Sequence, residues 1–117
     1  MTPEEMKGRT RAFALQVIKL AESLPKGRSV DSLVRQLINC STSVGSNYRA
    51  ACIARSKAEF TSKLQVALEE ADESQYWLEL LNRAGFSEGD LHSTVYKEAR
   101  ELTAMLMAGL RTARGLT

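Results

Sequence analysis

Apolar and small residues recur at alternating steps of three and four along this chain, and this spacing constrains the fold more than any other feature. The longest uninterrupted series is Val30, Val34, Leu37, Ser41, Val44, Tyr48 and Ala51. Such spacing places one stripe of side chains along one face of an α-helix that packs nearly parallel to a neighbour. No segment shows the two-residue alternation of a β-strand. The chain is therefore predicted to be all-α.

Capping signals divide the stripes into four helices. We expect these helices near residues 4–24, 29–54, 56–84 and 88–113. Thr2 and Ser56 each precede a glutamate by three positions, which is the pattern of a capping box. Ser29 and Ser87 are expected to cap the second and fourth helices, and Gly85 to end the third in a left-handed conformation. Because the links are short, the sequence predicts an antiparallel up-down four-helix bundle.

The composition is that of one ordinary globular domain, residues 1–117, with 44% hydrophobic and 26% charged residues. Formal net charge is +2, which neither compels nor excludes a polyanionic partner. No apolar run approaches the roughly 20 residues that span a bilayer. The acidic N-terminus lacks the apolar region of a signal peptide. We therefore expect a cytoplasmic protein with no membrane role.

No motif of a catalytic, metal or cofactor site occurs in the sequence, although the residue types alone leave a Ser-His-Asp arrangement open. The lone histidine, His92, lies near the start of a predicted helix and is expected at the surface. No paired Glu-x-x-His motif of a di-iron bundle, phosphate-binding loop or nucleophile elbow occurs. Cys40 and Cys52 lie about 18 Å apart along one predicted helix, too far for a disulfide. The sequence thus predicts a non-enzymatic protein with no cofactor, metal or small-molecule substrate.

The second and third predicted helices carry two further features. Small residues such as Ser41 and Ala71 occupy the middle of their seams, so these helices should form a closely packed central pair. Further apolar residues lie outside the seam of the third helix and have no evident partner inside one bundle: Val66, Leu68, Trp77 and Leu80. A second apolar stripe on one helix indicates contacts between subunits. We therefore expect a homo-oligomer.

Two polar groups interrupt this apolar pattern. Asn39, Ser43 and Asn47 recur every four residues on one helix face, where such residues are unfavourable because they compete for backbone hydrogen bonds. That face either packs against a partner helix or binds a ligand, and the sequence leaves both open. The densest acidic cluster is Glu69, Glu70, Asp72 and Glu73. It is expected to be a solvated face, with a partner-facing patch or an ion-pair network with Arg49 and Arg55 as alternatives.

These residues form a pattern that resembles a known family. The pattern is Ser43-Val44-x-x-Asn47-Tyr48, then Arg55, then Glu59-Phe60-x-x-x-Leu64-x-Val66-Ala67, and Glu73. It resembles the small four-helix-bundle family that includes the 23S rRNA intervening-sequence proteins. The resemblance extends over nearly the whole chain. Ala50 and Ala51 stand where Glu-Gly is usual, and Glu69-Glu70 where a small Gly-Ser pair is usual.

The resemblance implies an up-down bundle assembled into a ring, with five subunits the best single expectation. A related branch of the family accompanies the reverse transcriptase of diversity-generating retroelements and binds nucleic acid through basic surface. No catalytic residues are implied. The resemblance thus favours a non-enzymatic oligomeric module that binds RNA, DNA or a nucleoprotein partner. A protein–protein scaffold without a nucleic-acid role is the alternative.

The candidate partner surface combines the polar ladder with nearby charged residues. It comprises Asn39, Ser43, Asn47, Arg49, Arg55, Lys57, Lys63 and Glu73. Further basic candidates are Lys7, Arg9, Arg11, Lys26 and Arg28. Most of the seven aromatic residues are expected in helix seams. Any nucleic acid should therefore be bound through its phosphates and not by base stacking.

Overall fold

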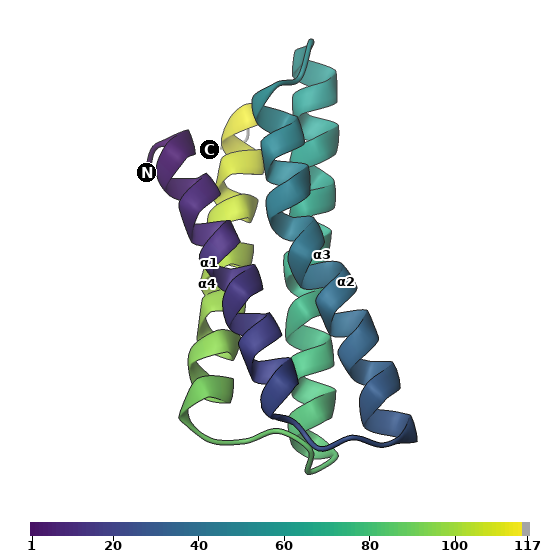
Figure 1. The fold of residues 1–117 in the computed structure, drawn as a ribbon. Coiled ribbons are helices and arrows are strands. Elements are labelled where there is room, and N and C mark those ends of the chain that lie inside the picture. Colours follow the sequence, from purple (N-terminus) through teal and green to yellow (C-terminus); the bar gives the residue numbers. More distant parts are fainter. Residues whose placement is uncertain (116–117) are drawn as a thin grey trace.

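The computed structural model describes residues 1–115 and consists of four helices joined by short links (Figure 1). The helices are α1 (Pro3–Ser23), α2 (Arg28–Cys52), α3 (Lys57–Arg83) and α4 (Asp90–Ala113). Every bound lies within two residues of its predicted position, and no strand occurs among the described residues. The all-α prediction is confirmed. The last two residues of the predicted domain, 116 and 117, lie outside the described part.

Two of the predicted caps form as expected. The Thr2 hydroxyl accepts a hydrogen bond from the Glu5 amide at 3.1 Å, and the Ser56 hydroxyl accepts one from the Glu59 amide at 3.0 Å. The Glu59 carboxylate also accepts from the Arg55 amide at 3.3 Å. These contacts satisfy backbone donors that have no partner within the helix. They define where α1 and α3 begin.

The predictions for Ser29 and Ser87 were wrong. Gly27 and Gly89 are the N-cap residues of α2 and α4 and have no side chain to cap these helices; at α2 the Gly27 amide donates to the Asp31 carboxylate at 3.4 Å. Gly89 has φ +93°, a left-handed conformation that glycine adopts without strain, so the chain turns into α4 two residues after Ser87. Gly85 has φ +84° and lies just past the end of α3, as predicted.

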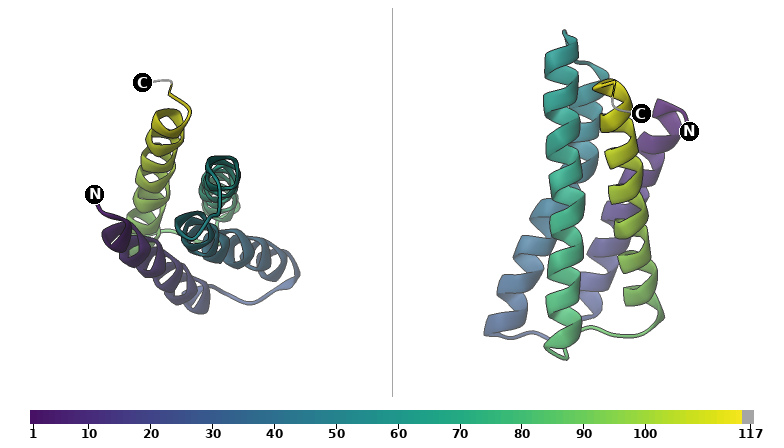
Figure 2. Two further views of the ribbon diagram at one scale, coloured as in Figure 1. Left: turned by 90° about the horizontal axis from the view of Figure 1, so that it is seen from above. Right: turned by 180° about the vertical axis from the view of Figure 1, so that it is seen from behind.

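Consecutive helices run in opposite directions and pack against one another (Figures 1 and 2). The α2–α3 pair packs most extensively and the α1–α4 pair least. Small side chains allow this close approach, and the buried Ser74 hydroxyl donates to the Cys40 sulfur across the α2–α3 seam at 3.3 Å. The predicted central pair is confirmed.

The core is built from the predicted stripes of all four helices. Leu37, Val44, Leu64, Leu78 and Leu106 are each at most 3% exposed. Two residues of the proposed second stripe on α3 belong to the same bundle, because Leu68 is buried and Trp77 packs against the core. The inference that this stripe lacks a partner inside the bundle was therefore wrong for Leu68 and Trp77. No helix in the described part of the chain is long and apolar enough to cross a membrane.

Candidate nucleic-acid interface

Basic side chains from α1 and α2 meet along a groove between these helices. The groove has a volume of about 220 Å³ and is lined by Lys7, Thr10, Arg11, Ala14, Thr42, Gly45, Ser46 and Arg49. None of these lining residues is acidic. Three positive side chains thus share one concave surface, which is where a polyanion would find its counter-charges.

Close packing of α1 on α2 forms the floor of this groove. A Cβ atom on Gly45 would lie 3.1 Å from Thr10 Oγ1, so glycine permits the helices to approach here. Thr10 is buried, and its hydroxyl donates to the carbonyls of Met6 and Lys7 at 3.0 and 3.1 Å. The other two hydroxyls in the lining likewise donate to carbonyls of α2, so the basic side chains are the donors that remain for a ligand.

The three basic side chains of the groove differ in whether they form an ion pair. Lys7 Nζ lies 3.2 Å from a carboxylate oxygen of Glu4, whose side chain is 84% exposed. Such an exposed pair contributes about 0–1 kcal/mol and can be displaced by another anion. Arg11 and Arg49 are exposed and take part in no ion pair within the described residues. The groove therefore offers two uncompensated guanidinium groups and one weakly paired ammonium group.

The polar ladder does not join this groove. The Ser43 hydroxyl donates to the Asn39 carbonyl at 2.8 Å, and the Asn47 amide donates to the Ser43 carbonyl at 2.9 Å. These bonds to the same helix explain how α2 tolerates Asn and Ser in its interior. At 3.6 residues per turn, Asn47 and Arg49 point about 160° apart around the helix axis. The expected single surface is thus divided between two faces of α2.

The remaining basic residues of the predicted partner surface lie where α2 passes into α3 and do not line the groove. Arg55 is exposed, and its Nε is 3.6 Å from a carboxylate oxygen of Glu59. Lys57 is the exposed first residue of α3, and Lys63 is half-buried about 1.7 turns later. The structure therefore brings Arg49 together with Lys7 and Arg11, and separates Arg49 from Arg55, Lys57 and Lys63.

The acidic cluster on α3 forms no ion pair with Arg49 or Arg55 among the described residues, so that alternative was wrong. Glu73 is exposed, in agreement with a solvated face. Burial, together with the charges of Glu73 and Glu69, raises the pKa of the Glu70 carboxyl. Burial is also the main reason that the Cys40 pKa rises to about 11. Both cysteines are free, as predicted.

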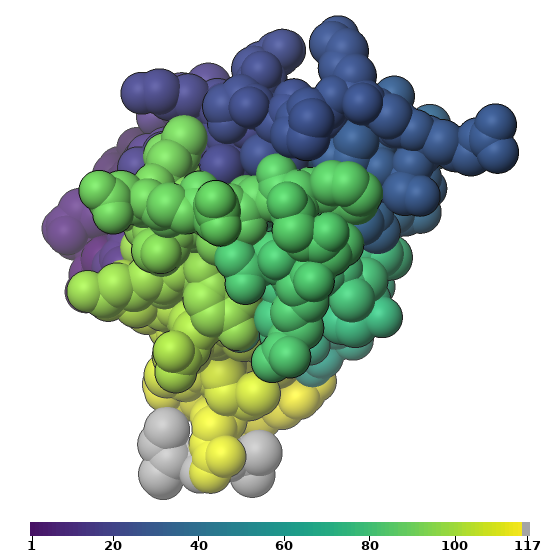
Figure 3. Space-filling model, turned by 90° about the horizontal axis from the view of Figure 1, so that it is seen from below, coloured from purple at the N-terminus to yellow at the C-terminus, as the bar shows by residue number. Residues whose placement is uncertain are grey.

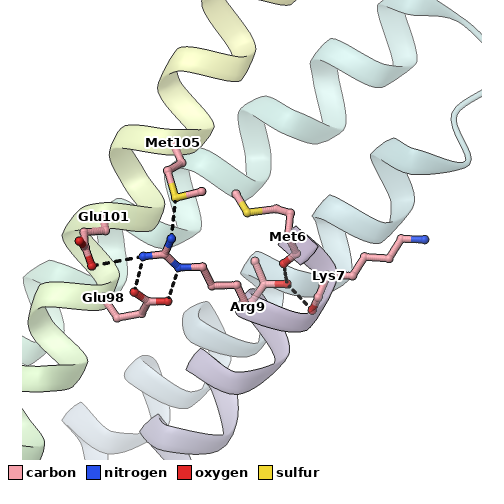
Figure 4. Close-up of polar contacts among 7 residues, drawn as sticks. Met6, Lys7, Arg9, Glu98, Glu101 and Met105 are labelled. Carbon is pink, nitrogen blue, oxygen red and sulfur yellow. Dashed lines mark hydrogen bonds and ion pairs between the residues drawn. The ribbon is translucent and has the colours of Figure 1, made fainter. Parts of the chain in front are cut away.

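Arg9 was a basic candidate, but it is engaged by α4 (Figure 4). Its Nε and Nη2 donate to the two carboxylate oxygens of Glu98 at 2.7 and 2.8 Å, and Nη2 also donates to Glu101 at 3.2 Å. The hydrogen bond to Glu98 is the main cause that raises the Arg9 pKa. Such bidentate pairs are strong and directional. Arg9 therefore links α1 to α4 and is unavailable to a ligand.

A second basic groove lies between α3 and α4 and was missed by the sequence analysis. It has a volume of about 730 Å³, and its lining includes Arg83, His92, Tyr96, Lys97 and Arg100. His92 is 6% exposed, so the expectation of a surface histidine was wrong. His92, Tyr96 and Arg100 recur every four residues, a spacing that could have revealed a shared helix face.

Comparison with known proteins places the chain in a family. Residues 5–108 match the family model described as 23S rRNA-intervening sequence protein. The chain belongs to the 23S rRNA-intervening sequence protein family. Its fold is similar to the crystal structure of a protein of unknown function from the S23 ribosomal protein family of Bacteroides thetaiotaomicron. That similarity has a TM-score of 0.86 and 30% sequence identity, and covers 95% of this chain and 99% of the other. No curated protein matches the chain.

Within the 23S rRNA-intervening sequence protein family, this member carries alanines where the resemblance led us to expect Glu-Gly. Ala50 is half-buried and Ala51 is 2% exposed, in the last two turns of α2. Neither side chain can ionise or donate a hydrogen bond. In this family member, any polar recognition near the end of α2 therefore depends on neighbouring residues such as Arg49.

Proposed function

We propose that this protein is a non-enzymatic, oligomeric module that binds nucleic acid, or the nucleic acid of a nucleoprotein partner, through the α1–α2 groove. The observation that carries the proposal is the convergence of Lys7, Arg11 and Arg49 on a surface whose lining includes no acidic residue. Membership of a family whose description refers to a 23S rRNA intervening sequence supports it. So does the resemblance to the accessory proteins of diversity-generating retroelements.

Phosphate contacts are the mechanism that this groove suits. Basic side chains that neutralise phosphates release condensed counterions from the nucleic acid. A plot of log affinity against log salt concentration therefore has a slope of about −0.9 for each phosphate contacted on duplex DNA. As expected, most aromatic rings are buried or half-buried, including those of Tyr96 and Trp77; Tyr76, at 54% exposed, is the exception among the described residues. Tyr76 lies on α3 and does not line the α1–α2 groove. Binding there should therefore depend on salt more than on base identity.

Assembly into a homo-oligomer is part of the same proposal, with a ring of five as the best single expectation. Three contacts per subunit would bind weakly alone, but a ring presents several grooves to one polyanion and raises their effective concentration. Leu15 is 61% exposed and Ile18 39% exposed, one turn apart on α1. These apolar side chains support burial against another subunit. Light scattering at micromolar concentration should give a mass several times 12.9 kDa, and a monomer would refute the assembly.

Fluorescence anisotropy with labelled structured RNA and duplex DNA, at low and moderate salt, tests the nucleic-acid function. Arg11→Gln and Arg49→Gln should each weaken binding and make the salt slope shallower by about one contact. Arg55→Gln should have a smaller effect, because Arg55 is paired with Glu59 outside the groove. Arg35→Gln is the matched control, since Arg35 is exposed on α2 and lines none of the described grooves.

Two results of that titration would contradict the proposal. Absence of binding by the oligomer at low salt would leave the scaffold alternative, which the exposed apolar residues Leu15, Ile53 and Tyr76 favour. Binding that does not weaken with salt would show that phosphates are not the contacted groups. If Arg35→Gln weakened binding as much as Arg49→Gln, the groove would not be the interface.

A further inference from the structure

The turn between α3 and α4 holds a histidine in a fixed orientation. Ser87 is 2% exposed, its amide donates to the Leu81 carbonyl at 3.1 Å, and its carbonyl accepts from the Asn82 side chain at 2.9 Å. With its backbone held in this way, Ser87 places its hydroxyl oxygen 2.7 Å from Nδ1 of His92. One nitrogen of the His92 ring is therefore engaged inside the protein.

The other ring nitrogen, Nε2, has no hydrogen-bond partner among the described residues. His92 is 6% exposed. Every fully buried side-chain nitrogen or oxygen in the described part of the chain has a hydrogen-bond partner. Since Nε2 has none, Nε2 is not fully buried. His92 lines the α3–α4 groove. A buried histidine thus presents an unpartnered polar atom to this groove.

Basic residues surround that atom. Arg83 at the end of α3 and Lys97 and Arg100 on α4 line the groove, with Glu79 as the one acidic residue in its lining. None of these three basic side chains takes part in an ion pair with any described residue. Figure 3 shows the end of the molecule where α3 passes into α4, in green. The groove therefore has a net positive charge beside a neutral hydrogen-bonding group.

The shape of the wall suits a compact ligand. The His92 and Tyr96 rings are nearly parallel, with an interplanar angle of 8° and centroids 6.5 Å apart. When the Ser87 hydroxyl donates to Nδ1, the His92 proton resides on Nε2, which then donates into the groove. A donor of this kind, surrounded by guanidinium and ammonium groups, is complementary to an anion with several acceptor oxygens.

We propose that the α3–α4 groove binds a phosphate monoester, with His92 Nε2 as the central donor and the three basic side chains as a charged rim. A phosphate monoester carries a charge of about −1.5 to −2 at neutral pH and three acceptor oxygens, which match this set better than a single-charged phosphodiester does. The ligand is a free nucleotide or the 5′-phosphorylated end of a nucleic acid. This site does not depend on the α1–α2 groove.

Nuclear magnetic resonance titration of the full chain tests the site, with AMP and a 5′-phosphorylated pentaribonucleotide as probes. Adenosine and the 5′-hydroxyl pentaribonucleotide are the matched controls. We expect saturable shifts at His92 and its neighbours with the two phosphorylated probes alone. If the phosphorylated RNA binds more tightly than AMP, the source of the phosphate is a nucleic-acid end. If the two probes bind equally, the source is a free nucleotide. Either result supports the site.

Substitutions separate the role of Nε2 from that of the fold. His92→Asn keeps an amide within reach of Ser87 but removes the donor to the groove, whereas His92→Gln places an amide near Nε2. Loss of one charge-assisted hydrogen bond should weaken AMP binding about tenfold in His92→Asn, and His92→Gln should retain most of it. Lys97 and Arg100 are exposed, so the pair Lys97→Gln and Arg100→Gln tests the rim without disturbing the core.

The double rim variant should bind AMP at least about tenfold more weakly, since two charged contacts are removed. Arg35→Gln and Arg49→Gln should leave AMP affinity unchanged, which distinguishes this site from the α1–α2 groove. The proposal is overturned if AMP produces no saturable shift at His92 at low salt, or if adenosine produces the same shifts. It is also overturned if Arg35→Gln weakens AMP binding as much as the rim variant does.

Discussion

Gly45 of α2 faces Thr10 of α1 so closely that a Cβ atom would lie 3.1 Å from the threonine hydroxyl oxygen. At that distance the threonine, which is itself buried, would have to move. The contact sets the separation of α1 and α2, and with it the width of the groove that holds Lys7, Arg11 and Arg49. A single glycine thus connects helix packing to the proposed interface.

Gly45→Ala and Gly8→Ala form a matched pair. Alanine is about 1 kcal/mol more favourable than glycine inside a helix, so Gly8→Ala, where the added methyl meets nothing within 4 Å, should stabilise the protein by roughly that amount. Overpacking costs about 1–3 kcal/mol, which should cancel or reverse the gain at Gly45. Urea denaturation of both variants measures the difference. Equal stabilisation would show that α1 moves away at no cost.

Leu64→Ala and Leu78→Ala should each destabilise the bundle by about 2–5 kcal/mol, through lost transfer free energy and a cavity. Leu78 is 0% exposed, whereas Leu64 already lines a pocket of about 370 Å³ at the end of the bundle. Leu78→Ala should therefore cost more than Leu64→Ala. Reversible thermal or urea melts provide the test, and a loss below about 1 kcal/mol at Leu78 would contradict the placement of the core.

The Arg9–Glu98 pair should join α1 to α4 where few other contacts do. Arg9→Leu is expected to cost about 1–3 kcal/mol, because Glu98 then loses two hydrogen bonds from a charged donor. A double-mutant cycle with Glu98→Gln isolates the coupling between the two side chains. Lys19→Leu, an exposed base on α1 without an ion pair among the described residues, is the control. A coupling near zero would contradict a structural role for the pair.

Burial lowers the pKa of His92 below its ordinary value of 6.5. The unfolded chain then takes up a proton at a higher pH than the folded protein does. The stability from the neutral imidazole is therefore fully present above about pH 6.5 and is lost as pH falls from there to the folded pKa. The groups that face His92 across the groove are Glu79, Arg83, Lys97 and Arg100.

Urea denaturation at pH values from 7.5 to 5.5 tests this dependence. Wild-type stability should fall across that range more than the stability of His92→Gln, which lacks the titrating group. The difference between the two profiles removes contributions from carboxylates. Parallel profiles would indicate that His92 titrates alike in the folded and unfolded states.

The two thiols should differ in reactivity. Burial raises the Cys40 pKa to about 11, so its thiolate is scarce at pH 8, and the side chain is also 3% exposed. Cys52 is half-buried near the end of α2. A thiol reagent such as Ellman's reagent should modify one thiol per chain readily in the native protein and both after unfolding. Cys52→Ser should abolish the rapid phase, and rapid modification of that variant would contradict the burial of Cys40.

Local patterns predicted the helices well because helix formation depends on near neighbours. The three–four spacing located all four helices, and the caps at Thr2 and Ser56 define two of their starts. Ser29 and Ser87 failed as caps because α2 begins one residue before Ser29, and α4 begins after the left-handed Gly89, three residues beyond Ser87. The assembly into a ring stays a prediction, since subunit contacts are not visible in a single chain.

The candidate site was predicted less well because a surface depends on how helices pair and rotate. Of the candidate surface residues, Arg49 lines the α1–α2 groove, whereas Ser43 and Asn47 bond to carbonyls of their own helix and lie outside the groove. Glu98 is 89 residues from Arg9 in the sequence, and no local pattern could indicate that it withdraws this arginine from the basic surface. His92 was misplaced because its burial depends on the conformation of the turn that carries Ser87, five residues earlier.

Four amphipathic helices and a core along their three–four stripes follow from the sequence, because periodicity and caps depend on neighbouring residues. Which polar side chains share a surface follows from the way the helices fold against one another. Lys7 and Arg11 join Arg49 because α1 approaches α2 at Gly45, and His92 becomes a buried groove residue because the turn after α3 brings Ser87 to its ring. The first relation joins distant parts of the sequence and depends on how whole helices pack. The second joins residues five apart and depends on the conformation of the turn, which residue spacing alone does not specify.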